Sequence, residues 1–496
     1  MAKVAMRQAP GALKKLPLES FSLADDVSGR ITHVLIQSDS KPRIPFIESA
    51  VEQMGGHVHF SIAFPHGRYS KLSDDDREAL KKVADDNLGR VSLVRVHTDP
   101  SNYAQDAFIS LVSDEGPAVM LGEDALIADR GGSFNRRAGD AKIVKTLLGG
   151  GGFVAVDTNQ DALGLAWFQM GDAVSDDKTI FLGPDTLNQN LYAKMLAHQK
   201  ALLKGIEPPH GYWLLDEPKR GVRFLTNLNL NNDLGFDEAW VYRRRSITKP
   251  MTDNPSFSQA YEEVLASASR PLHSFESHHE KEQKDFLSHL KAFWDINRFL
   301  HAGADSETVA SVRSDVLDKV GVVAGGRRLA LMERFDRMVH HVDTHITPLG
   351  DNVVLVGDTN WGLSLLSASE RKRFEKWTLS FNGDAAGELD DKAAFIAGLG
   401  YAVDRIPLVA KDVRTDFTSP MLSYNNVNLE VYGDGGGTVR TVYLPEYGFP
   451  DLDAAARQVY ERHDFGVVAI QGLAGVIRSG SSERCNMKVL RRDRRL

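Results

Sequence analysis

Strand patterns alternate with helix patterns along most of the chain, and this alternation constrains the fold more than any other feature. Short apolar runs rich in β-branched residues predict strands, and apolar residues spaced three or four apart predict amphipathic helices. Strands that alternate with helices are typical of an α/β fold, in which helices cover the faces of sheets. The predicted strands are 33–37, 57–64, 90–96, 353–356, 429–432, 439–444 and 466–470, and the predicted helices are 45–54, 74–86, 191–203 and 452–463.

Two further patterns complete the layout of the 496-residue chain. Residues 108–112 and 118–121 flank a polar turn at 113–116, which predicts a hairpin. A central region carries helical periodicity with few strand formers, over 258–266, 278–299 and 306–319. We therefore expect an irregular lead-in at 1–30, a first α/β part at 31–254, a helical insertion at 255–325 and a second α/β part at 326–496.

The composition argues against several classes of protein. Lys and Arg number 59 against 67 Asp and Glu, and the formal net charge is −8. A general nucleic-acid binder presents a basic surface, so this class is disfavoured. No run of about 18 or more apolar residues occurs, so we expect no membrane-spanning helix. A single cysteine and an N-terminus without an apolar signal core favour a cytoplasmic protein.

The one cysteine, Cys485, is either an inert core residue or a nucleophile, because a lone thiol forms no intramolecular disulfide or thiolate metal cluster. A glycine and two serines precede it, which suits a tight loop. Positive charge favours thiolate over thiol, so its basic neighbours predict a pKa below the usual ~8.5. Buried structural cysteines are the commoner kind, but the polar flanks favour a nucleophile here, which requires a histidine and a carboxylate elsewhere. The basic neighbours are Arg484, Lys488, Arg491 and Arg492.

A histidine-rich segment, His340–His345, lies shortly before the predicted strand 353–356. His341 and Asp343 alternate, so an extended strand would turn both side chains to one face, as acid–base chemistry on a charged substrate requires. The three histidines and the aspartate also permit a metal site, although His340 and His341 would then face opposite sides of the strand. A polar surface loop is the third interpretation.

Two weaker candidates lie in the first part of the chain. Asp106, in Gln105-Asp-Ala-Phe, stands at the start of the predicted hairpin, where an aspartate is often only a turn or cap residue. The run Gly149–Gly152 precedes an apolar stretch, so its backbone could approach a substrate closely, or it could be a flexible loop. Its spacing fits neither a dinucleotide fingerprint nor a phosphate-binding loop.

In chain order these features are Asp106, the glycine run, His341 with Asp343, and Cys485. This order resembles the guanidine-modifying enzyme superfamily, which includes the arginine, agmatine and peptidyl-arginine deiminases and the amidinotransferases. The resemblance covers roughly residues 30–250 and 328–493. It implies a pentein fold, a five-bladed pseudosymmetric α/β propeller of ββαβ units, with the helical region 255–325 inserted in it.

Individual segments carry the resemblance. Gln105-Asp106 looks like the family's Arg-Asp segment, and His341-Val-Asp343 looks like its His-X-Asp. Ser423-Tyr-Asn-Asn-Val-Asn428 and the segments after it resemble the C-terminal deiminase module, and Arg484-Cys485-Asn-Met-Lys-Val-Leu-Arg is similar to arginine deiminase. The chain departs from the family at the glycine run. Most small-molecule deiminases have an acidic residue directly before these glycines, whereas this chain has Leu147 and Leu148. The peptidyl-arginine deiminases also lack that acidic residue.

The resemblance implies roles for these residues. Asp106 and Asp343 would bind a substrate guanidinium, Gly150 and Gly151 would approach it, Cys485 would attack its carbon, and His341 would transfer protons, with no metal or other cofactor. The implied activity is a hydrolase acting on linear amidines, a guanidino deiminase. An amidinotransferase and a non-catalytic binding protein on the same fold are the alternatives. The expected partners are a small guanidino substrate or an arginyl peptide, neither nucleic acid nor membrane, and possibly a second copy of the chain.

Overall fold

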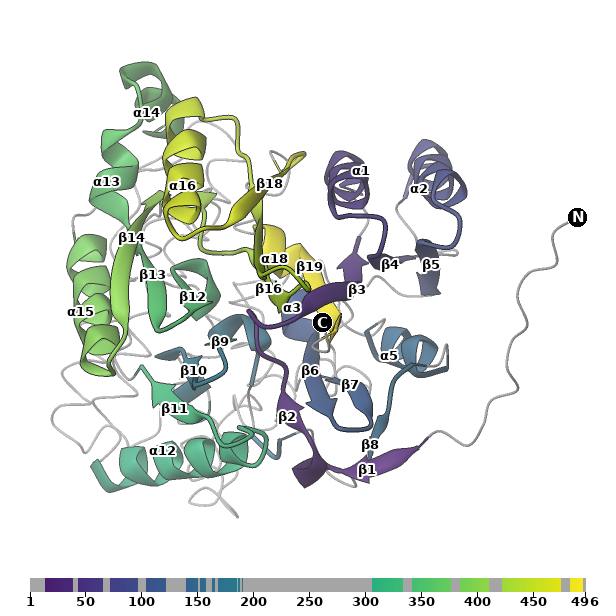
Figure 1. Cartoon of the computed structure of the whole chain (residues 1–496), viewed down its shortest axis with the longest axis horizontal. Coiled ribbons are helices and arrows are strands. Elements are labelled where there is room, and N and C mark those ends of the chain that lie inside the picture. Colours follow the sequence, from purple (N-terminus) through teal and green to yellow (C-terminus); the bar gives the residue numbers. More distant parts are fainter. Residues whose placement is uncertain are drawn as a thin grey trace, which may run out of the picture.

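The chain folds into a mixed α/β structure, as the alternation of strands and helices predicts (Figure 1). The predicted helices 191–203, 258–266 and 278–299 lie outside the described residues, and so does most of the expected insertion. No helix in the described part is long and apolar enough to cross a membrane. The computed structural model describes residues 14–38, 43–65, 72–96, 104–121, 140–149, 152–157, 163–165, 168–184, 186–187, 190, 306–332, 341–375, 384–409, 422–473 and 482–493.

Three sheets share one unit: an antiparallel hairpin, then helical structure, then a strand that joins the hairpin in parallel. In each unit the returning strand pairs with the second hairpin strand, so the helical connection crosses one face of the sheet. The first unit contains β9 (Ala173–Ser175), β10 (Thr179–Leu182), α12 (Ser306–Gly321) and β11 (Arg328–Leu331). The second contains β12 (Ile346–Gly350), β13 (Val353–Asp358), α13 (Thr359–Ser364), α14 (Ala368–Glu375), α15 (Asp384–Gly398) and β14 (Ala402–Val409), with β15 (Leu422–Ser423) added. The third contains β16 (Asn428–Gly433), β17 (Thr438–Pro445), α16 (Pro450–Arg462) and β18 (Gly466–Ile470).

A fourth unit joins the two ends of the chain. The last strand, β19 (Met487–Asp493), pairs antiparallel with β3 (Arg30–Gln37), and Figure 1 shows the yellow arrow of β19 beside the purple arrow of β3. The chain then continues through α1 (Ile44–Gln53) into the parallel strand β4 (His59–Pro65). The sheet ends with α2 (Asp74–Asp86) and β5 (Val91–Val96). The C-terminal segment therefore completes the N-terminal sheet.

A fifth set of elements begins with the predicted hairpin, β6 (Phe108–Ser113) and β7 (Gly116–Leu121). It continues through α5 (Asp140–Gly149) to β8 (Ala155–Asp157), and Val154 N–H donates to the Pro117 carbonyl of β7. The expected lead-in is not wholly irregular, since β1 (Lys15–Pro17) pairs with β8 and β2 (Ser22–Leu23) pairs with β6. These short strands gain the ladder hydrogen bonds that exposed sheet edges offer.

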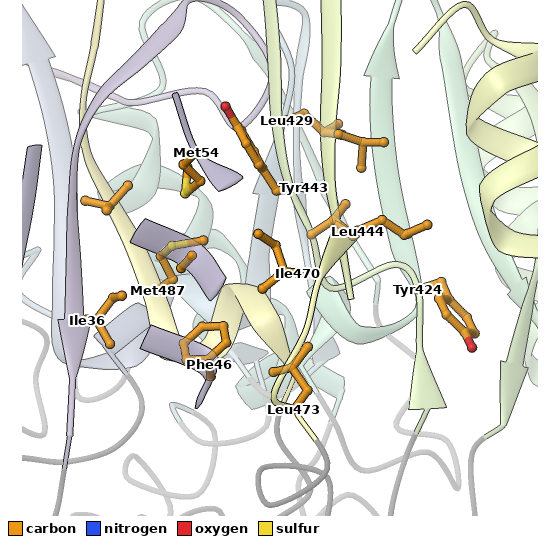
Figure 2. Packing of buried hydrophobic residues seen from close by; sticks show 14 of the residues in the cluster. Ile36, Phe46, Met54, Tyr424, Leu429, Tyr443, Leu444, Ile470, Leu473 and Met487 are labelled. Carbon is orange, nitrogen blue, oxygen red and sulfur yellow. The ribbon is translucent and has the colours of Figure 1, made fainter. Parts of the chain in front are cut away.

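The largest apolar cluster binds the N-terminal and C-terminal units together. Figure 2 shows Phe46 of α1 and Met487 of β19 in one packed group with Ile470 and Leu444 of the third unit, all fully buried. Burial of this kind supplies the main favourable free energy of folding, so the chain ends are held by the core as well as by the β3–β19 ladder.

Local sequence signals explain several element boundaries. The predicted helix 74–86 matches α2, because Ser73 and Asp76 form a capping box at its start. Within the expected insertion, residues 306–321 form α12, whose Val312, Val316 and Val320 are buried against the first unit. The segment 255–305 lies outside the described residues, so the four-part division of the chain stays a prediction.

Candidate active site

Short turns that lead into the first strand of successive units carry the candidate site residues. α3 (Ala104–Ala107) precedes β6, and α18 (Glu483–Asn486) precedes β19. Two 3-10 turns, η2 (Met170–Asp172) and η3 (Val342–Thr344), precede β9 and β12. η2 packs against both α3 and η3, and α18 packs against α3. Residues far apart in sequence therefore meet where the hairpin units begin.

Cys485 lies in α18, one helical turn rather than the loop that its glycine and serine neighbours predicted. Its side chain is 7% exposed and belongs to none of the apolar clusters of the described residues. Its backbone N–H donates to Asn426 Oδ1 at 3.0 Å. Cys485 is therefore buried in polar surroundings, which an inert core cysteine does not need.

His341 and Asp343 also differ from the extended strand that their spacing predicted. Residues 342–344 form a 3-10 turn, because the Thr344 N–H and hydroxyl both donate to the His341 carbonyl, at 3.0 and 2.8 Å. Such local side-chain-to-backbone bonds compete with strand pairing. Asp343 is fully buried, and His341 Nδ1 lies 3.4 Å from Asp106 Oδ1.

Gly171 is a site residue that the sequence analysis missed. A β-carbon at this position would lie 2.6 Å from Asp106 Oδ1 and closer still to His341 Nδ1, so only glycine fits beneath this pair. The neighbouring Met170 carbonyl accepts from Gln105 Nε2 at 3.3 Å. Gly150 and Gly151 lie outside the described residues, and their predicted role stays untested. A single glycine in a short polar turn carries no distinctive sequence signal.

Arg484 also has a role that its position beside Cys485 did not indicate. Its guanidinium is 3% exposed and donates to Asp343 Oδ2 at 2.7 Å and to Asp26 Oδ1 at 2.8 Å. The other oxygen of Asp343, Oδ1, is buried and accepts no hydrogen bond within the described part of the chain. A buried carboxylate oxygen in this state is ready to accept an N–H from a ligand.

Asn426 forms hydrogen bonds both to α18, which carries Cys485, and to η3, which carries Asp343. Its side-chain oxygen accepts from the Cys485 N–H, its side-chain nitrogen donates to the Asp343 carbonyl at 3.4 Å, and its own carbonyl accepts from the Arg484 N–H at 3.3 Å. It is fully buried two residues before β16. Asn426 lies in the segment 423–428 that the resemblance singled out, although no role for it was predicted.

The electrostatics of Cys485 overturn one prediction. Burial raises the pKa of its thiol well above the usual range, and the charges of Asp343 and Asp106 raise it further. Arg484 lowers the thiol pKa only as a smaller effect, because two carboxylates already bind its charge. The Arg492 guanidinium donates hydrogen bonds to backbone carbonyls, such as that of Asp26 at 2.8 Å. The pKa of the Cys485 thiol is therefore raised, which favours the thiol form, and not lowered as its four basic neighbours predicted.

Burial likewise raises the pKa of Asp343 to about 6, against the lowering effect of Arg484. Asp343 is therefore mostly ionised at pH 7 and protonated in mild acid.

Among the described residues, no group of three or more His, Cys, Asp or Glu side chains is arranged to hold a metal ion. His340 lies outside the described residues, and His345 is buried with its Nε2 3.1 Å from Lys392 Nζ. A lysine ammonium at that nitrogen competes with a metal cation for it.

Comparisons with known proteins give only distant likenesses. No family model matches the chain, and no curated protein matches it. Among solved structures, an agmatine deiminase of C. jejuni is 8% identical, with a TM-score of 0.47, over 95% of this chain and 97% of that one. An agmatine deiminase of Enterococcus faecalis is 10% identical, with a TM-score of 0.44, over 97% of this chain and 98% of that one. At these TM-scores the likeness carries no argument about the function of this chain.

Proposed function

We propose that this chain is a cysteine-dependent hydrolase that deiminates a guanidino compound and releases ammonia and a ureido product. One observation carries the proposal: a thiol, a histidine and two carboxylates from three distant segments converge in a buried site. His341 lies 3.4 Å from Asp106, and the charges of Asp106 and Asp343 both act on the Cys485 thiol. Buried carboxylates are costly unless paired, so a site with two of them favours a cationic ligand.

A guanidinium matches the acceptors that the site offers. It is a planar cation with N–H donors on each edge, which suits carboxylate oxygens in fixed positions. Asp343 Oδ2 already accepts a hydrogen bond from Arg484, so Oδ1 is the oxygen that can accept one from the substrate. Asp106 supplies the second carboxylate beside His341. The substrate carbon would then lie near Cys485.

The chemistry follows from the state of the thiol. A neutral Cys485 is a poor nucleophile, but a bound guanidinium brings positive charge beside the sulfur and favours its thiolate. Cys485 transfers its proton to His341, the thiolate attacks the guanidinium carbon, and the C–N bond to one amino group breaks as His341 donates that proton to the departing amino group, which leaves as ammonia. His341 then removes a proton from water, which attacks the amidino–sulfur intermediate and displaces Cys485. The net reaction consumes one water and one guanidinium and gives the ureido product and ammonia, which carries away the remaining proton as ammonium.

We also propose that the fold is the five-bladed propeller implied by the resemblance. Three repeats of hairpin, helical connection and parallel strand support it, together with a fourth unit in which the antiparallel pair of β19 and β3 is followed by α1 and the parallel strand β4, and with the related set β6, β7, α5 and β8. The turns that carry Asp106, Gly171, Asp343 and Cys485 stand at equivalent points of their units, just before the first strand. Pseudosymmetry of this kind brings equivalent turns together at one centre.

The test is incubation of the protein with agmatine, arginine and an arginyl peptide, with ammonia release and the intact protein mass as readouts. We expect ammonia from at least one compound and a transient mass gain that maps to Cys485. Cys485→Ala should abolish both while the circular dichroism spectrum stays unchanged. A mass gain without ammonia, discharged by an added amine, would favour the amidinotransferase. Neither adduct nor ammonia with any compound would favour the binding protein.

A further inference from the structure

Lys488 is a buried lysine that the proposed chemistry does not use. β19 puts it directly opposite Leu35 of β3, and side chains of paired strand residues share one face of the sheet. Leu35 packs with Ala104 and Ala107 of α3, the turn that carries Asp106. Lys488 therefore lies on the sheet face that α3 covers, three residues after Cys485.

Within the described part of the chain, the ammonium of Lys488 lacks a hydrogen-bonded or ion-paired partner. The side chain is 2% exposed, and within the described part of the chain it makes no hydrogen bond or ion pair. An ammonium removed from water without a partner is costly, so something nearby must offset the charge. The charged groups that act on it from the packed elements are Arg484 of α18, Asp26 after β2, Asp106 of α3 and Asp343 of η3. Among the described residues, its compensation thus comes from Asp26 and from the two carboxylates of the proposed substrate site.

We propose that Lys488 is a built-in counter-cation of the two-carboxylate site, and that a guanidinium entering the site drives a proton off its ammonium. The inference rests on the proposed function, because it takes the guanidinium as the ligand. It assigns Lys488 as a residue that tunes substrate affinity with pH. Lys488 acts through the carboxylates and is not itself placed on the reacting atoms.

The direction of the effect follows from the charges around Lys488. Burial, and then Arg484, lower its pKa to about 7, while Asp26, Asp106 and Asp343 hold it up. A guanidinium between Asp106 and Asp343 cancels part of that support and adds a like charge, so the pKa falls further and the proton leaves. By linkage, loss of the proton must tighten guanidinium binding by the same factor. Affinity should therefore rise as pH rises through about 7.

The experiment uses Cys485→Ala protein, which blocks the reaction and removes the thiol as a proton source. Calorimetric titration with agmatine and with arginine, in two buffers of different ionisation enthalpy, counts the protons released. Near pH 7 we expect about half a proton per ligand bound, since Lys488 is about half protonated there. Between pH 6.5 and 8 the affinity should rise about fourfold, the change expected for release from a group of pKa about 7.

Variants separate Lys488 from other titrating groups. In a Cys485→Ala background, Lys488→Met should abolish most of the proton release and flatten the affinity profile, leaving the small share of Asp343. Lys488→Arg keeps a permanent cation and should bind weakly at every pH in this range. Lys145→Met removes an exposed lysine of α5 and should leave proton release unchanged.

The outcomes distinguish this inference from the proposed function. Guanidino compounds that bind with an affinity flat between pH 6.5 and 8 overturn the inference, with no Lys488 variant needed, and leave the proposed function intact. Proton release that persists in Lys488→Met also overturns it. If no guanidino compound binds Cys485→Ala protein at any pH, both the inference and the proposed function fail.

Discussion

Burial, and then the charges of the same carboxylates that would bind its substrate, raise the pKa of Cys485 and favour its neutral thiol. Such an arrangement couples reactivity to occupancy: without a cation between Asp106 and Asp343, the thiol keeps its proton and stays unreactive toward other electrophiles. Arg484 does not relieve this, because Asp343 and Asp26 share its charge. At the scale of single residues, the positive charge that enters the site would thus control the reactivity of Cys485.

Removing either carboxylate charge should therefore weaken guanidinium binding more than it harms the fold. Asp106→Asn and Asp343→Asn each remove a charge-assisted acceptor worth on the order of 1.5–3 kcal/mol. Dissociation constants of Cys485→Ala protein for agmatine and arginine measure the effect. Asp157→Asn, at an exposed position, is the matched control and should bind like the parent. Unchanged affinity in both site variants would argue against a two-carboxylate site.

Glu483, two residues before Cys485, should make the stability of the protein depend on pH. It is fully buried, with Oε1 accepting from Asn428 at 2.7 Å, and burial raises its pKa to about 8. A carboxyl whose folded pKa is raised contributes most below its unfolded pKa of about 4.5, and that contribution is lost as pH rises toward 8.

Glu483→Gln should remove this dependence. Relative to the variant, the parent's free energy of unfolding should fall by on the order of a few kcal/mol between pH 5 and pH 8. Denaturant unfolding at several pH values measures the difference. For Glu461→Gln, at an exposed position of α16, the free energy of unfolding should change with pH as it does in the parent. If the free energy of unfolding of Glu483→Gln also changed with pH as in the parent, Glu483 would have to be ionised in the folded protein.

At the scale of elements, long periodic segments were predictable from sequence and the site turns were not. The helix 74–86 shows apolar spacing over several turns and a capping signal, so its bounds follow from local rules. α3 and α18 have four residues each, about one helical turn, so no periodicity exists to detect. The residue types Asp106, His341, Asp343 and Cys485 could be singled out, but the 3-10 turn at 342–344 and the tie through Asn426 depend on partners far away in the chain.

Gly171 tests how tightly these turns must pack. Gly171→Ala puts a methyl group between His341 and Asp106, which must move apart, and a displacement of about 1 Å in a catalytic pair can cost on the order of 100-fold in rate. We expect kcat/KM for the best guanidino substrate to fall by roughly that factor. Gly387→Ala in α15, where a β-carbon meets nothing within 4 Å, should leave activity unchanged. Full activity in Gly171→Ala would contradict the site geometry.

At the scale of the whole molecule, pairing of the last strand with an early one makes the fold depend on its C-terminus. A propeller of local units could be assembled from neighbours in sequence, but β3 finds its antiparallel partner more than 450 residues away, in β19. The sequence predicted both an α/β class and a C-terminal cysteine segment. It could not predict that Met487 and Phe46 share a core, because hydrophobic pattern specifies burial and not the partner.

Met487→Ala should therefore destabilise the two ends of the chain together. Truncating a fully buried methionine costs about 2–5 kcal/mol, and the cavity would open in the cluster that joins α1 to β18 and β19. Hydrogen exchange should report faster opening in β3 and β4 as well as in β17 and β18. Val322→Ala, at a side chain 41% exposed, should change stability by at most about 0.5 kcal/mol. Faster exchange confined to β17–β19 would mean that β3 and β4 stay folded when β19 is destabilised. That result would contradict the claim that one core stabilises both ends of the chain.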